Sequence, residues 1–423
     1  MTSLLSAEVT DFVQAEIKRL DTDIYNLQRA IWENPEVGYE EFFAHDTITS
    51  FMEKQSGWDV TRKAFGLDTA FVCVFSHNPS DSTPVISYNA EYDALPSIGH
   101  ACGHNLITAC GVTAALSTAL AMKKFNIAGT VKLFGTPAEE GGGGKCKLLE
   151  AHAFDGCDVS MMGHGMDCRP TPYLITNATQ RFTVEFFGKE AHAAASPWQG
   201  VNALDAMVIL YNAVSVLRQQ LKPTDIVQLA VNDGGTVPNI ITGYSKAEFS
   251  VRAPTVPRLR EVQAKVFNCV KAGALASGCK YRVKETICYY NNIVNDVLAE
   301  RFTSNMNSVF GHSIPPIEET RRNGESPGST DQSNISWEIP SIHALFELGG
   351  PGVGPHTKPF AEAAGTREGY DSSLQTGMSL GLIGLELLQN PELLAKVKEQ
   401  FKADIKAAGD LTKAVETVES LES

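Results

Sequence analysis

The sequence predicts an α/β protein: a mostly parallel sheet covered by helices, with an inserted ferredoxin-like α+β domain. Short apolar runs alternate with helical patterns up to residue 177, which is typical of a parallel sheet covered on both faces. Over residues 178–293 the order becomes βαββαβ, the ferredoxin-like arrangement. From residue 294 the helix-rich pattern resumes. We therefore expect a larger discontinuous domain, 1–177 and 294–423, interrupted by a smaller one at 178–293.

The larger domain opens with a predicted amphipathic helix. Its apolar residues are spaced by three and four positions and share one face, and Asn34-Pro35 ends it. The apolar residues are Val13, Ile17, Leu20, Ile24, Leu27 and Ile31. Strands are expected at 69–75, 84–90, 130–135 and 158–163, and helices at 106–122 and 145–154.

The smaller domain contains four alternating segments and two helical ones. Strands are expected at 181–189, 225–232, 246–254 and 280–290, and helices at 202–221 and 256–276. The apolar face of the first helix is expected to pack on its own sheet; it consists of Leu204, Val208, Tyr211, Val214, Leu217 and Leu221. An edge strand of the same sheet is the better candidate for homodimer pairing across a two-fold axis.

Composition narrows the class of protein. Of 423 residues, 43% are hydrophobic and 20% charged, as in soluble globular proteins. The net charge of −14 disfavours nucleic-acid and membrane partners. The N-terminus lacks the pattern of a signal peptide, and no apolar stretch approaches about 18 residues. Nine scattered cysteines favour a reducing compartment, so we expect a cytoplasmic protein.

Polar residues follow three predicted strands, and a fourth segment carries a histidine in a glycine-rich loop. Ligands of open α/β sheets gather at the carboxyl ends of strands, so these segments are candidates for a site. Taken singly, each has an ordinary explanation as a structural thiol, a solvated acidic loop or a loop histidine. The segments are NAEYDALPSIGHACGHN with Asp93, Cys102 and His104, LFGTPAEEGGGGK with Glu139 and Glu140, DVSMMGHGMD with His164 just past its strand, and GGPGVGPHTKPF with His356.

In combination, these segments predict a metal centre. Five donors exceed the needs of one tetrahedral zinc and suit two divalent ions about 3.5–4 Å apart that share a bridging water. Adjacent carboxylates repel unless cations lie close, so one would ligate and the other would act as general base. The donors are Cys102, His104, Glu140, His164 and His356, with Glu139 left over as the base.

A Cys–His amidase is the competing interpretation of the same residues. It would make Cys102 a nucleophile. It leaves the remaining histidines and the carboxylate pair without a role, so we favour the metal centre.

The motifs together resemble the metallopeptidase family M20, which contains aminoacylase, carnosinase, hippurate hydrolase and the auxin-conjugate amidohydrolases. HACGHN, PAEE, GHG, GKEAHAAASPWQGVNALDA and the late histidine carry the resemblance, which covers roughly residues 10–390. It implies a catalytic domain holding two metals and a lid that also serves dimerisation. In the cysteine-containing branch, the five donors above ligate the metals and Glu139 is the general base. Asp93 matches an acid that steadies the metal site.

The same resemblance implies functions for three residues of the lid. His192 matches a histidine that reaches the neighbouring subunit's site in related dimers and polarises the scissile carbonyl. Asn239 and Arg252 match positions that hold the substrate's free carboxylate, a task suited to a guanidinium. Asn105 and Asn89-Ala-Glu91-Tyr92-Asp93 depart from the amidohydrolase pattern. HACGHNLI, PAEEGGGGK and GSTDQSN are more similar to the cytosolic dipeptidases acting on β-alanyl-lysine-like and Xaa-Arg dipeptides.

The resulting hypothesis is a metal-dependent amide hydrolase that cleaves dipeptides or N-acyl amino acids. A hydroxide bridging two metals would attack the carbonyl, with Glu139 as general base and His192 helping to stabilise the oxyanion. Cysteine ligation favours zinc, and manganese, cobalt or nickel could also activate. The alternative is a catalytically silent protein that binds a peptide or amino-acid conjugate in the same cleft.

Overall fold

A six-stranded sheet organises the first of two units of the chain. The computed structural model describes residues 4–324, 326, 328–350 and 352–409. Within these, the first unit takes the residues up to 175, 292–326 and 330–407, and the second takes 176–291, 328–329 and 408–409.

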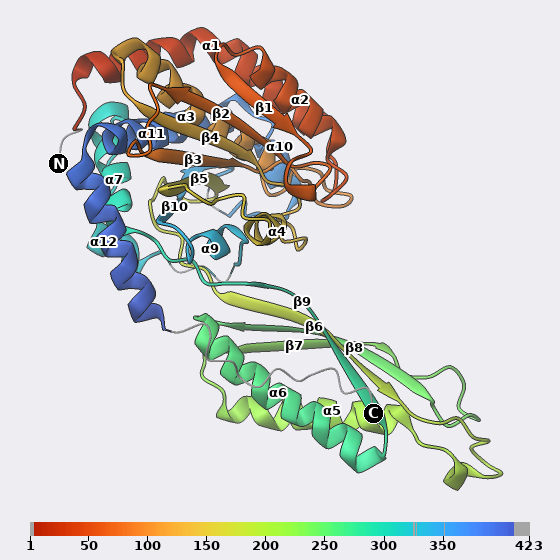
Figure 1. Ribbon diagram of the computed structural model, residues 1–423. Helices are drawn as coiled ribbons and strands as arrows, with labels where there is room; N and C mark the ends of the chain where they lie inside the picture. The colour runs from red at the N-terminus through yellow and green to blue at the C-terminus, as the bar shows by residue number, and fades with distance from the viewer. Residues whose placement is uncertain (1–3, 325, 327, 351, 410–423) are drawn as a thin grey trace. The chain divides into compact units, whose positions relative to one another are not determined.

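The sheet of the first unit is mostly parallel, as predicted. Its order is β1-β2-β4-β3-β5-β10, and β2 alone runs antiparallel to its neighbours (Figure 1). The strands are β1 (Trp58–Arg62), β2 (Phe71–His77), β3 (Val85–Ala90), β4 (Gly129–Gly135), β5 (Val159–Met166) and β10 (Ser341–Glu347). Because β3, β4 and β5 are parallel neighbours, the loops that follow them emerge at one edge of the sheet.

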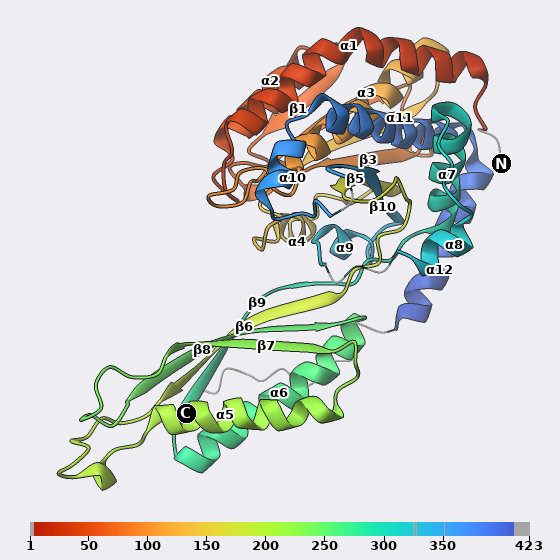
Figure 2. The ribbon, with the colours of Figure 1, turned by 180° about the vertical axis from the view of Figure 1, so that it is seen from behind.

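Helices cover both faces of this sheet. On one face α1 (Ala7–Glu33), α3 (His104–Phe125) and α11 (Arg367–Gln389) pack against one another and enclose the main core (Figures 1 and 2). On the other face a smaller core forms around Phe134, Leu148 and Ile335, beneath α4 (Gly144–Glu150) and α9 (Gln332–Ile335). The remaining helices are α2 (Phe42–Glu53), α7 (Asp296–Phe310), α8 (Ile317–Arg322), α10 (Lys358–Ala363) and α12 (Pro391–Ala408).

Helix α3 is long and apolar enough to cross a membrane by composition. However, 94% of its most apolar window is buried inside the structure. Glycines allow close packing on two sides of α3: a Cβ on Gly111 would lie 2.6 Å from Asn89 O of β3, and one on Gly377 of α11 would lie 2.6 Å from Cys110 O of α3. This helix is therefore the central core helix that the sequence predicts over 106–122.

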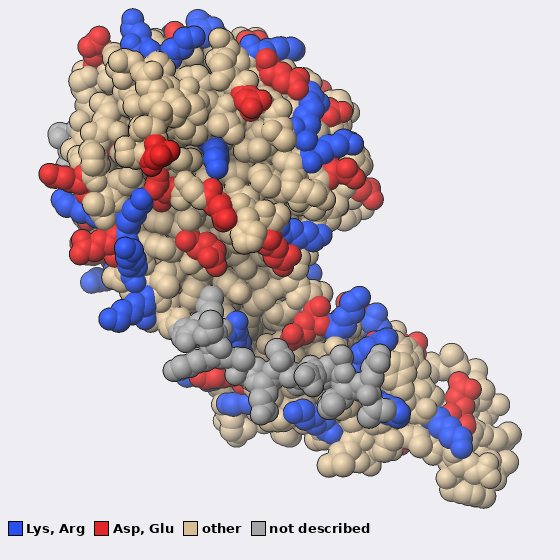
Figure 3. All heavy atoms as spheres, in the orientation of Figure 1, with Lys and Arg blue, Asp and Glu red and all other residues tan. Residues whose placement is uncertain are grey.

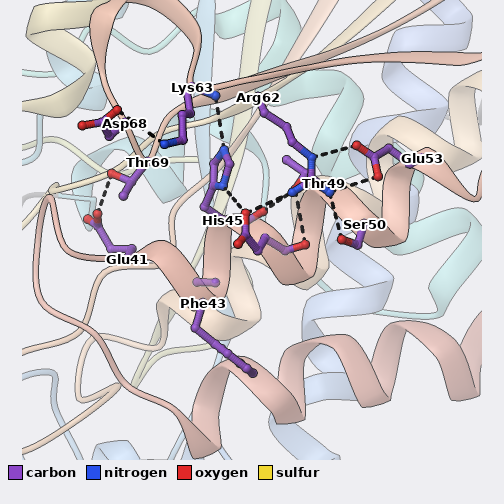
Figure 4. Close-up of polar contacts among 12 residues, drawn as sticks. Glu41, Phe43, His45, Thr49, Ser50, Glu53, Arg62, Lys63, Asp68 and Thr69 are labelled. Carbon is purple, nitrogen blue, oxygen red and sulfur yellow. Dashed lines mark hydrogen bonds and ion pairs between the residues drawn. The ribbon is translucent and has the colours of Figure 1, made fainter.

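Several local elements differ from the expectation. The elements α2, β1 and β10 were not predicted. Arg62 on β1 is tied to α2 by hydrogen bonds to Glu53 and Ser50 (Figure 4) and to Asp46. Two large apolar residues at the start of α2 face solvent, since Phe42 is 48% and Phe43 41% exposed. The helix expected to reach residue 154 ends at Glu150, and β5 continues to Met166 rather than stopping at 163.

The second unit has the predicted βαββαβ order. Its antiparallel sheet has the order β7-β8-β6-β9, and α5 (Ala203–Leu217) and α6 (Val256–Ser277) pack on it. The strands are β6 (Ala178–Phe187), β7 (Ile226–Asp233), β8 (Tyr244–Ala253) and β9 (Lys280–Tyr289). Side chains of Asn202 and Thr255 cap the two helices by accepting hydrogen bonds from their first turns.

The predicted packing face of α5 is wrong in part. Val208 and Tyr211 are about half exposed, at 50% and 49%. The residues buried against the sheet are instead Ala203, Ala206, Met207, Leu210 and Val214. The helix is therefore rotated from the expected face, with Val208 and Tyr211 turned toward solvent.

Charges of both signs are dispersed over one face of each unit. On the face drawn in Figure 3, acidic and basic side chains lie interspersed over each unit. The excess of acidic residues in the sequence therefore does not gather into one field on this face.

Candidate metal centre

Cys102 and His104 are placed by the loop between β3 and α3. His104 is the first residue of α3, and the residue before it, Gly103, adopts φ 75°. Few residues other than glycine adopt this left-handed conformation, and a Cβ on Gly103 would also meet Leu348 at 3.0 Å. The turn buries both Cys102 and His104. The short C-x-H spacing thus brings a thiol and an imidazole into one interior pocket.

Glu139 and Glu140 follow β4 in a loop that other buried groups hold. Ala138 has φ 55°, and its amide donates to Glu41 Oε1 at 2.8 Å. The amide of Glu140 donates to Asp93 Oδ2 at 3.0 Å. Gly144 starts α4 where a Cβ would lie 1.7 Å from Pro137 O, so only glycine fits there. These contacts, rather than flexible glycines alone, fix the two carboxylates.

His164 lies within β5 and not just past it as expected. Its Nδ1 lies 2.6 Å from Gly165 O, which makes Nδ1 the donor and leaves Nε2 as an acceptor. That Nε2 lies 3.5 Å from Cys102 Sγ. His164 is therefore oriented with its lone pair toward the thiol.

His356 lies in the loop between β10 and α10. It has φ 64°, and its amide donates to Ala101 O at 2.7 Å. Its Nε2 lies 3.2 Å from Glu140 Oε1, and its side chain is 55% exposed. It is the most accessible member of the cluster.

The five predicted donors and Glu139 come together in the first unit. Three overlapping sets have ligand atoms within 4.8 Å of one another: Cys102, His104 and His164; Cys102, Glu140 and His356; and His104, Glu139 and Glu140. Cys102, His104 and Glu140 each belong to two of these sets, so the three sets form one continuous cluster.

A buried atom without a hydrogen-bond partner shows that a cation would fit within this cluster of donors. His104 Nε2 has no hydrogen-bond partner although its ring is fully buried. A buried nitrogen without a partner is costly, and a cation would satisfy it. Thiolate, imidazole and carboxylate are the donors that zinc takes in proteins. The residues present therefore fit a pair of divalent cations.

The electrostatics of the cluster favour metal ligands over a cysteine nucleophile. Burial raises the pKa of the Cys102 thiol, whereas an activated nucleophile needs a lowered one. Burial also opposes ionisation of Asp93, but the charge and hydrogen bond of His104 outweigh it and lower the pKa of Asp93. Burial, with Glu140 and Glu91 nearby, raises the pKa of Glu139 well above its ordinary range.

The three lid residues lie in the second unit, and only two of them are neighbours there. His192 and Asn239 are exposed and occupy adjoining loops, because Ala193 N donates to Asn239 O at 3.0 Å. Arg252 lies near the end of β8, whereas those loops join its start at Tyr244. Eight residues of strand separate the two positions by about 26 Å. The second unit therefore does not bring Arg252 to the other two.

Three charged residues near the centre were not predicted as site residues. Lys145 Nζ lies 2.5 Å from Glu91 Oε1 and 2.5 Å from Asp331 Oδ1, and all three side chains are fully buried. Glu91 Oε2 lies 3.5 Å from His104 Nε2. Each residue belongs to a segment noted for its motif. The signal available was a charged residue within each of these motifs: Glu91 in NAEYD, Lys145 after EEGGGG and Asp331 in GSTDQSN.

The chain is similar to known proteins over most of its length. The model of "Peptidase family M20/M25/M40" matches residues 88–372. A protein of Mus musculus named Xaa-Arg dipeptidase is 41% identical over 388 residues, which cover 90% of this chain and 89% of that protein.

Two solved structures share the fold. One is a putative aminohydrolase from methicillin resistant Staphylococcus aureus, with TM-score 0.72, 19% identity, and coverage of 88% of this chain and 98% of that one. The other is a dinuclear metal binding peptidase from Bacillus subtilis, with TM-score 0.63, 21% identity, and coverage of 87% and 99%.

Proposed function

The chain belongs to peptidase family M20/M25/M40, and we propose that it is a dipeptidase whose activity depends on two divalent cations. The observation that carries the proposal is the convergence of six predicted residues from four distant segments into overlapping ligand sets. Cys102, His104, Glu140, His164 and His356 would hold the cations. When bound, such a pair polarises a carbonyl oxygen and activates a water.

Glu139 is suited to move the proton in this reaction. It is buried beside Glu140, and its raised pKa makes it a stronger base than an exposed carboxylate. It would accept a proton from the attacking water and pass it to the leaving amine. Burial also keeps bulk water away from the carboxylate.

Zinc is the cation that the donor set favours. Cys102 supplies a soft donor shared by two of the ligand sets, and thiolate selects zinc over magnesium or calcium. Manganese, cobalt or nickel could activate the same site. A thiol ligand must stay reduced, which supports a reducing compartment such as the cytoplasm.

The substrate class follows from the relatives. The mouse and human proteins named Xaa-Arg dipeptidase are 41% and 40% identical to this chain. We therefore propose dipeptides with a cationic C-terminal residue as substrates, with N-acyl amino acids as the second class. The carboxylate of such a substrate would bind Asn239 or Arg252, and its carbonyl would meet His192.

The positions of the lid residues support a homodimer. A dipeptide is much shorter than the distance of about 26 Å between the two ends of β8. One substrate therefore cannot contact both Arg252 and His192 of the same chain. If both act on one substrate, the second must come from another copy, and the edge strands β7 and β9 offer pairing surfaces.

A substrate screen tests the proposal. Zinc-, manganese- and cobalt-loaded protein is incubated with dipeptides Ala-Arg, Ala-Lys, Ala-Leu and Ala-Asp, β-alanyl-lysine, and acetylated amino acids, and products are read by mass spectrometry. We expect Ala-Arg and Ala-Lys to be cleaved fastest. Glu139→Gln should lower kcat by about 10²–10⁴-fold, whereas the exposed Glu150→Gln should not. Tight binding without cleavage, in every metal form, would identify a silent binding protein instead.

A further inference from the structure

The buried triad of Lys145, Glu91 and Asp331 is built asymmetrically. Asp331 uses both carboxylate oxygens on Lys145: Oδ1 accepts from Nζ at 2.5 Å and Oδ2 accepts from the backbone amide at 2.9 Å. Glu91 uses only Oε1, at 2.5 Å from Nζ. Its other oxygen, Oε2, is fully buried and has no hydrogen-bond partner. A buried carboxylate oxygen without a hydrogen bond is costly, so Oε2 of Glu91 calls for another partner.

The free oxygen of Glu91 faces the metal centre. It lies 3.5 Å from His104 Nε2, another buried atom that has no hydrogen-bond partner. Asp93 occupies Nδ1 of His104, so Nε2 is the nitrogen left for a cation. Two donors that share a zinc-sized cation in tetrahedral geometry lie about 3.4 Å apart. The observed separation matches that spacing.

We propose that Glu91 is a further donor to the cation that His104 holds, and that Lys145 and Asp331 are positioning residues that aim its carboxylate. This inference rests on the proposed function, because it requires a cation at His104. Lys145 reaches Glu91 across 54 positions and Asp331 across 186, so the triad locks three separate segments around that cation.

Metal binding to the chelator-stripped chain tests this directly. Zinc or cobalt is titrated in competition with a chromophoric chelator, and the cobalt form is also followed by its visible ligand-field absorption. Glu91→Gln keeps the shape and the contact to Lys145 but loses the charge. We expect this variant to lower the affinity for one of the two cations by about 10–100-fold and to leave the affinity for the other near the wild-type value. We also expect it to change the cobalt spectrum.

Two further variants separate metal binding from folding. Glu386→Gln is the matched control, because Glu386 is also a buried carboxylate paired with a buried cation, Arg301. It should lower Tm without changing metal affinity. The charge-neutral combination of Glu91→Gln, Lys145→Met and Asp331→Asn should recover stability relative to Lys145→Met alone. It should not recover the metal affinity that Glu91→Gln loses.

The outcomes distinguish the two proposals. If the wild-type chain binds two cations, and Glu91→Gln or the neutral combination binds both with wild-type affinity and spectrum, the triad is structural and the role of Glu91 is overturned. If the wild-type chain binds no cation, both the inference and the proposed function are wrong.

Discussion

Asp93 Oδ1 lies 3.0 Å from Nδ1 of His104, with both side chains buried in the interior. The second oxygen of Asp93 accepts from the amide of Glu140. One carboxylate therefore orients the imidazole of one predicted ligand and anchors the backbone of another. It also selects Nε2 of His104 as the atom that faces the cluster.

Removing this carboxylate should loosen the metal centre. We expect Asp93→Ala to lower cation affinity by about 10–100-fold, since partners behind a ligand typically contribute that much. Chelator competition measures it, with the exposed Asp81→Ala as control. Unchanged affinity in Asp93→Ala would show that His104 needs no orienting partner.

Glu41 should make stability depend on pH. It accepts hydrogen bonds from Thr69 (Figure 4) and Ala138, and burial, followed by the charge of Asp93, raises its pKa from 4.5 to about 7. Between those values the folded chain holds a proton that the unfolded chain does not. The free energy of unfolding therefore falls as pH rises through this window, by up to about 1.4 kcal/mol per pH unit.

Glu41→Gln removes that contribution while keeping an acceptor for the amide of Ala138. Urea denaturation of chelator-treated protein at pH 5 and pH 7 compares the two chains. Wild type should lose more stability over this interval than the variant. Equal losses would mean that Glu41 does not titrate there.

Removing one partner of the buried ion pair between Arg301 and Glu386 should strongly destabilise the first unit. Arg301 Nε lies 2.7 Å from Glu386 Oε2, and its Nη2 lies 2.7 Å from Oε1. Arg301→Met would leave a buried carboxylate without its cation and should cost about 3–5 kcal/mol. The double variant Arg301→Met with Glu386→Leu should cost much less. A single variant that loses under 1 kcal/mol in urea denaturation would contradict this account.

Subunit complementation tests the proposed sharing of sites. His192→Ala and Glu139→Gln should each be inactive alone. Mixed one to one and allowed to exchange, they should recover roughly a quarter of wild-type activity, because half of the dimers pair one intact base with one intact lid histidine. A mixture that stays inactive, together with a monomer in light scattering, would place His192 within its own chain or outside the reaction.

The sequence was sufficient for strands β2, β3, β4 and β5 of the sheet, the inserted βαββαβ unit and the gathering of ligand segments, but not for the outer strands β1 and β10. Those ligands follow strands of a parallel sheet, whose carboxyl ends meet at one edge. Three further features depended on packing between distant residues and left no periodic signal: the contacts of Lys145 with Glu91 and Asp331, the pairing of α2 with β1, and the rotation of α5 that exposes Val208 and Tyr211. Small alanines and single charged residues carry little information about orientation until the partner surface is known.

Metal stoichiometry measured with activity is the most direct test of the account. Protein purified without chelator is analysed by inductively coupled plasma mass spectrometry, stripped, and then titrated back with zinc while hydrolysis of Ala-Arg is followed. We predict two divalent cations per chain, loss of hydrolysis on stripping, and recovery that is complete at two equivalents. A stripped chain that retains full activity, or one that recovers it with no more than one cation, would contradict the central claim.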